Sequence, residues 1–131
     1  LEVEIKAFGQ AENLWKTQGQ VTNSAGNLCL HLLGNLNTYI GANLGGSGYI
    51  RDREAEFSRT GIAREDLLHQ ITEVKNRIAY TLDKLSPAQL QQAYPQQVLG
   101  YDMTVSYFLI HLHGHLNYHL GQINYLRRLL K

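Results

Sequence analysis

Four of the six histidines of this chain lie within nine residues near its C-terminus, in the segment HLHGHLNYH (residues 111–119). An α-helix turns about 100° per residue, so a step of four returns a side chain to nearly the same face. His115 and His119 therefore share a face, and two imidazoles spaced in this way can bind one metal ion. His111 continues the same stripe but lies roughly 12 Å along the axis from His119, whereas His113 faces elsewhere.

A fifth histidine, His31, lies between leucines in the segment NLCLHLLGNL. Burying an imidazole without a hydrogen-bond partner costs about 2 kcal/mol or more, so His31 needs a partner. If its helix packs antiparallel to the last one, His31 can meet His115 and His119. Three imidazoles around an open fourth position are typical of catalytic rather than structural metal sites. The alternative is that these histidines only form hydrogen bonds inside a core.

Other polar residues are candidates for a supporting role around such a site. Asn35, Tyr39, His111 and Gln122 lie one or two turns from the three histidines and could contact a ligand histidine, a water or a substrate. Arg51 and Arg53 follow a glycine-rich break and could hold a carboxylate of a substrate or thiol cofactor. The alternatives are helix-bridging contacts for Asn35 and Gln122, a place in the core for Tyr39 and a solvated loop for the arginines.

Hydrophobic periodicity and capping residues predict an all-α protein. Ser24 and Thr104 are suitable N-caps, and GGSG at residues 45–48 ends the helix before it. Residues 93–103 are expected to form a loop or short strand. Three long helices and a short first one, which we expect to be truncated, predict a single four-helix-bundle domain over residues 1–131. The expected helices span residues 1–8, 25–44, 64–85 and 105–130.

The expected helices differ in how many apolar faces they carry. Residues 64–85 have one apolar stripe, which is typical of an outer helix with a wet face. The helices expected over residues 25–44 and 105–130 are apolar on more than one face. Because a small monomer has little with which to cover two such helices, we expect a homodimer formed through both.

Composition excludes several classes of function. The formal net charge of +1 and the absence of a basic stripe argue against a nucleic-acid or anionic-membrane partner. A single cysteine, Cys29, excludes an intrachain disulfide and a multi-cysteine zinc site. No apolar run reaches the roughly 18 residues of a membrane span. The first ten residues lack the apolar core of a signal peptide, so a cytoplasmic location is expected.

Two segments together resemble one known family. HLNYHLGQI (residues 115–123) is similar to the last-helix signature of the DinB/YfiT-like family, which is H-x-x-x-H followed by x-G-Q-[IL]. SAGNLCLHLLGNL (residues 24–36) resembles the second helix of that family, with His31 in the place of a metal ligand. The resemblance follows the order of segments along essentially the whole chain. GGSGYIRDREAEF (residues 45–57) resembles an uncharacterised bacterial subgroup.

The resemblance implies a bundle with down-up-up-down topology and a divalent metal, usually zinc or nickel, held by His31, His115 and His119. It also implies a homodimer. Some members of the wider superfamily are transferases or isomerases that use a low-molecular-weight thiol, so we expect a metal-dependent enzyme acting on a small electrophilic molecule. The alternative is a metal- or ligand-binding dimeric bundle without catalysis. A metalloprotease is excluded, because HLNYH lacks the glutamate of H-E-x-x-H.

Overall fold

The computed structural model describes residues 1–130, and the regular elements in that range are helical. One isolated antiparallel bridge joins Ala93 to Thr104, where a loop or short strand was expected. A 3₁₀ helix and a π-helical segment, η1 and η2, accompany the α-helices. The elements are α1 (Glu2–Lys6), η1 (Ala11–Trp15), α2 (Ala25–Leu36), η2 (Asn37–Ala42), α3 (Arg53–Ser58), α4 (Arg64–Asp83), α5 (Pro87–Gln91) and α6 (Val105–Leu129).

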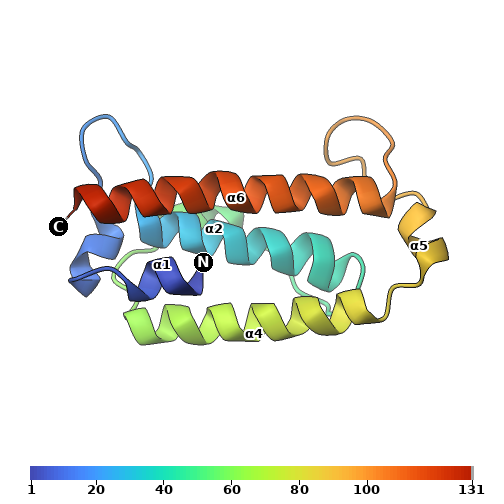
Figure 1. Ribbon diagram of the computed structural model, residues 1–131, viewed down its shortest axis with the longest axis horizontal. Helices are drawn as coiled ribbons and strands as arrows, with labels where there is room; N and C mark the ends of the chain where they lie inside the picture. Colours follow the sequence, from blue (N-terminus) through green and yellow to red (C-terminus); the bar gives the residue numbers. More distant parts are fainter. Residues whose placement is uncertain (131) are drawn as a thin grey trace.

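The three long helices lie lengthwise beside one another, and the short α1 lies against α4 and α6 (Figure 1). Following the colours from blue to red, α2 and α4 run in one direction, and α1 and α6 run in the other (Figure 1). Helix α2 is thus antiparallel to α6, which is the arrangement that lets His31 meet His115 and His119. None of the helices in residues 1–130 is long and apolar enough to cross a lipid bilayer.

The predicted helix starts are confirmed by their caps. The Ser24 hydroxyl accepts a hydrogen bond from the backbone N–H of Asn27, and the Thr104 hydroxyl accepts one from the N–H of Tyr107. Each cap satisfies an amide that has no partner within its own helix. The helix expected over residues 25–44 is α-helical only to Leu36, and a π-helical segment then continues it to Ala42.

Helix α2 is the centre of the molecule. Eleven of its twelve residues are buried, because α3, α4, α6 and η1 pack around it. The prediction that α2 contributes to a dimer interface is therefore wrong: its apolar faces are already covered by the same chain. Helix α4 agrees with its amphipathic pattern, since Leu67, Ile71 and Val74 are buried and most of its other residues are exposed.

Helix α3 is attached to α2 by polar contacts and by close packing. The Asn27 side-chain amide donates hydrogen bonds to the backbone carbonyls of Glu56, at 3.0 Å, and Arg59, at 2.8 Å. About two turns further along α2, Gly34 has no side chain, and a Cβ there would lie 1.9 Å from Oε1 of Glu56. These two positions place α3 close enough for Glu56 to reach the inside of the protein.

Candidate metal centre

The structure brings His31 of α2 together with His115 and His119 of α6. The Nε2 atom of His115 lies 3.2 Å from Nε2 of His31 and 3.1 Å from Nε2 of His119. One ring nitrogen from each residue lies within 4.8 Å of the other two. With zinc–nitrogen bonds of about 2.0–2.1 Å, two ligands of a tetrahedral ion lie roughly 3.3–3.4 Å apart. The observed separations are close to that value.

Two of the three rings are oriented by an acceptor on their far side. The Nδ1 atom of His31 lies 3.0 Å from Oε2 of Glu56, and Nδ1 of His119 lies 2.7 Å from Oε1 of Gln122. Nη2 of Arg51 also lies 3.2 Å from Nδ1 of His31, but it donates to the closer Oε2 of Glu56, at 2.9 Å. Because Glu56 and Gln122 offer acceptor oxygens, each Nδ1 carries the proton and donates it. The Nε2 atoms of both rings then keep their lone pairs, and these point toward His115.

The donor set fits a cation better than it fits a core hydrogen-bond network. A neutral His115 has one proton, so its Nε2 can donate to only one of the two lone pairs that face it. Its Nδ1 is buried and has no hydrogen-bond partner within residues 1–130. Three imidazole nitrogens that converge with at most one proton among them leave lone pairs facing one another. A divalent metal ion would satisfy all three.

Glu56 of α3 is the functional residue that the sequence analysis missed. Its carboxylate is 5% exposed and accepts hydrogen bonds from Nε of Arg51 at 2.7 Å, from Nη2 of Arg51 at 2.9 Å and from His31. A glutamate in a polar connecting segment has no periodicity that marks it as buried. The one available signal was Gly34, a small residue one turn from His31 where a neighbouring element can approach.

Arg51 binds a carboxylate, as its side chain suggested, but that carboxylate belongs to the same chain. With Nε and Nη2 committed to Glu56 and the side chain only 15% exposed, Arg51 supports the His31 contact. Its guanidinium also lies over the ring of Tyr39, 5.8 Å from the centroid. The expectation that Arg51 holds a substrate or cofactor is thus replaced by a role inside the protein. Arg53 is exposed on the first turn of α3.

The remaining candidates lie one or two turns along the chain from the histidines. Asn35 is 7% exposed, and its Oδ1 has no hydrogen-bond partner in the described part of the chain. The ring of Tyr39 packs edge-on against Phe108, with centroids 5.3 Å apart. His111 is exposed, stacks on the same phenylalanine at 5.7 Å and is not part of the three-histidine group.

His113 and Tyr118, which lie close to the histidine pair of α6 in the sequence, are also exposed. His113 faces solvent beside Asn117, as its angular position predicted. Tyr118 is 66% exposed and its ring lies 5.2 Å from that of His119. Tyr118 therefore lies largely in solvent rather than in the core of the protein.

Burial lowers the pKa values of two of these histidines, His115 and His31. Desolvation, followed by the neighbouring imidazoles of His119 and His31, lowers the pKa of His115 to about 4. Desolvation also lowers the pKa of His31, and the hydrogen bond to Glu56 opposes that shift. Both rings are therefore neutral at pH 7, which is the form that binds metal.

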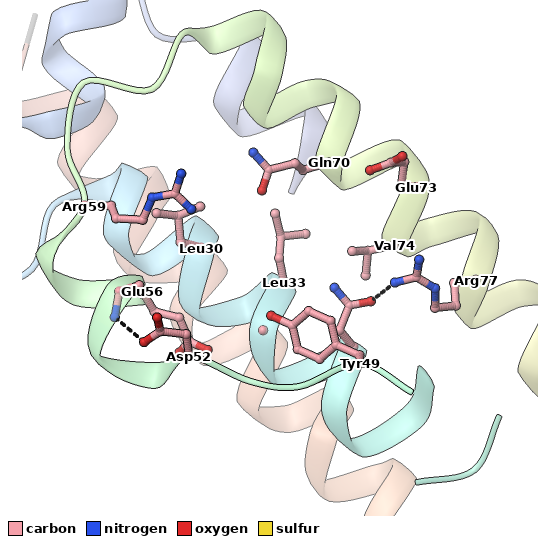
Figure 2. A pocket seen from close by; sticks show the side chains of 13 residues that line it. Leu30, Leu33, Tyr49, Asp52, Glu56, Arg59, Gln70, Glu73, Val74 and Arg77 are labelled. Carbon is pink, nitrogen blue, oxygen red and sulfur yellow. Dashed lines mark hydrogen bonds between the residues drawn. The ribbon is translucent and has the colours of Figure 1, made fainter. Parts of the chain in front are cut away.

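A charged cleft of about 380 Å³ lies between α2, α3 and α4, on the other side of Glu56. Figure 2 shows Leu30, Leu33 and Val74 in its middle, with Arg59 and Arg77 on opposite sides. Nη1 of Arg77 donates a hydrogen bond to Oδ1 of Asn37 at 2.5 Å. None of the three histidines lines this cleft.

Comparison with curated proteins and with solved structures gave no match. A family model described as "Protein of unknown function (DUF1572)" matches residues 3–131, which is nearly the whole chain. The chain therefore belongs to the DUF1572 family.

Proposed function

We propose that this protein is a divalent-metal-dependent enzyme whose metal is held by His31, His115 and His119. The observation that carries the proposal is the convergence of three Nε2 atoms, two of them on rings whose Nδ1 protons are directed at Glu56 and Gln122. Imidazole ligands suit zinc and nickel, and these are the metals we expect. Three protein ligands leave coordination positions free, as in catalytic zinc sites.

In such a site the ion acts as a Lewis acid and lowers the pKa of a water or thiol in its open positions. The chain's own residues would orient the reactants. Asn35 is buried, lies one turn beyond His31 and has a free acceptor oxygen for a hydrogen bond from such a ligand. We propose a small electrophilic molecule as the substrate, with a low-molecular-weight thiol as a candidate cosubstrate.

We also propose that the chain is related to the DinB/YfiT-like proteins and forms a four-helix bundle with down-up-up-down topology. The helix directions in Figure 1 support this topology, with α1 as the short first helix. The x-G-Q-I residues that follow His119 also support the relationship. The glutamine of that motif, Gln122, accepts a hydrogen bond from Nδ1 of His119 and so orients the imidazole.

A homodimer through α6 alone is the oligomer that the exposed surface favours. Tyr107 and Ile110, in the N-terminal half of α6, are 50% and 74% exposed, and aromatic side chains on an open helix face are common at subunit interfaces. A binding protein without catalysis is the second candidate. The pairing of Glu56 with Arg51 favours this non-catalytic candidate. Because Glu56 is already paired, the contacts described for the three histidines include no free carboxylate that could act as a general base.

The test is the metal content of tag-free protein purified without metal columns, measured by elemental mass spectrometry. We expect one divalent ion per chain, and its loss in the His31→Ala and His119→Ala variants. His113→Ala is the matched control, because it removes an exposed histidine from the same helix. Protein that stays metal-free after incubation with zinc or nickel, or a His113→Ala variant that alone loses the ion, would contradict the proposal.

A further inference from the structure

A second cavity adjoins the histidine cluster on the side of the C-terminal half of α6. It has a volume of about 450 Å³, within the roughly 300–1,000 Å³ of ligand pockets. His119 and Gln122 form part of its wall. A molecule in this cavity therefore touches one of the three proposed metal-binding imidazoles and the glutamine that orients it.

The wall of this cavity is mostly apolar, and its polar side chains carry no acid or strong base. Residues from three segments meet here: the loop before α2, one turn of α2 and the last turns of α6. None of the eleven lining residues is an aspartate, glutamate, lysine or arginine. They are Gln20, Val21, Thr22, Asn23, Leu28, Tyr118, His119, Gln122, Tyr125, Leu126 and Leu129.

A charged group placed in this cavity would lose solvation without gaining an ionic partner, which is unfavourable. An aromatic or aliphatic group would pack against Val21, Leu28 and Tyr125. Because Oε1 of Gln122 accepts from His119, the NH₂ end of the same amide remains as a hydrogen-bond donor at the wall. The cavity is thus suited to an apolar body with at most a neutral polar group.

The charged cleft described above provides the contrast. Asp52, Arg59 and Arg77 line that cleft, but the three histidines do not. A ligand selected for its ionic groups would bind there, away from the proposed metal. A ligand that binds at the proposed metal instead meets the uncharged wall of the second cavity, which includes His119.

We infer that the metal centre takes an uncharged, largely apolar organic molecule, which places a donor atom at the metal and an arm of about aromatic-ring size in this cavity. This inference rests on the proposed metal site and specifies the class of its substrate. It also assigns Val21 and Tyr125, neither of which is a metal ligand, as residues that determine specificity.

Three hydroxamic acids test the inference on zinc-loaded protein, because they share one metal-binding group and differ in the arm. Calorimetry should show phenylacetohydroxamic acid binding about tenfold or more tightly than acetohydroxamic acid, as expected for burying a ring. A carboxylate on the para position of the ring should remove this gain. Zinc loading is measured first, so failure of the metal site is seen separately.

The matched variants are Val21→Glu, at the cavity wall, and Val3→Glu, on α1 outside the cavity. Both valines are exposed, at 45% and 75%, so neither substitution disturbs the core. Val21→Glu should abolish the gain from the phenyl arm and leave acetohydroxamic acid binding unchanged, whereas Val3→Glu should change neither. Three results on zinc-loaded protein would overturn the inference. They are a phenyl arm that adds no affinity, a carboxylate arm that binds more tightly than the phenyl arm, and an affinity for the phenyl arm that Val21→Glu leaves unchanged. A cavity covered by a second copy of the chain would give the first of these results.

Discussion

Replacing Glu56 should weaken metal binding although its carboxylate is not a metal ligand. The side chain accepts two hydrogen bonds from Arg51 and one from Nδ1 of His31, at 2.7–3.0 Å, and is almost fully buried. In a Glu56→Ala variant the proton of His31 has no fixed acceptor, so neither its tautomer nor its ring orientation is held. Loss of a partner of this kind typically lowers metal affinity about 10–100-fold.

The same substitution should also lower the free energy of unfolding. Removing one member of a buried ion pair costs about 3–5 kcal/mol, and we expect the lower end because the 15% exposed side chain of Arg51 can turn toward solvent. Glu56→Gln keeps the shape and one acceptor oxygen, so its effects on affinity and stability should both be smaller. Glu54→Gln, an exposed residue of the same helix, is the matched control.

The assay has two readouts. Urea unfolding in the presence of a chelator gives the stability of the metal-free protein, and competition with a chromophoric chelator gives the zinc affinity. Nitrogen NMR of the metal-free protein reports directly whether Nδ1 of His31 carries the proton. A Glu56→Ala variant that is less stable, but keeps both the zinc affinity and the His31 tautomer of the unchanged protein, would refute the positioning role.

The remaining predictions concern packing, the thiol and pH. Gly34→Ala should displace Glu56, because the new Cβ would lie 1.9 Å from Oε1, and should lower both zinc affinity and melting temperature. Gly114→Ala, with open space around its Cβ, should instead raise stability by about 0.4–1 kcal/mol. Burial raises the pKa of the Cys29 thiol to about 12, so iodoacetamide at pH 8 should label it only in unfolded protein, as mass spectrometry would show. Because the pKa of His115 falls from 6.5 in the unfolded chain to about 4, the unfolded chain takes up the proton first. Metal-free protein should therefore lose stability as pH falls from 6.5 toward 4; urea titrations showing no loss in that range would contradict this.

Local patterns in the sequence were sufficient to predict most of the secondary structure. The caps at Ser24 and Thr104, the glycine-rich break and the single apolar stripe of α4 depend on neighbouring residues only, so they can be predicted without a fold. The three histidines could be grouped for a related reason. His115 and His119 share a face by helix geometry alone, and His31 in a leucine-rich helix requires a polar partner that an antiparallel neighbour can supply.

Tertiary packing decided what supports those histidines. Glu56 is distant from His31 in sequence and becomes its partner because Gly34 and the Asn27 hydrogen bonds bring α3 against α2. Helix α2 is also covered by other elements of the same chain, although its several apolar faces had favoured a dimer interface. The pairing of Arg51 with Glu56 and the uncharged wall beside His119 are also products of long-range contact. Such features depend on which distant segments meet. A residue such as Gly34 leaves room for a neighbour, but the spacing within one helix does not specify which segment fills it.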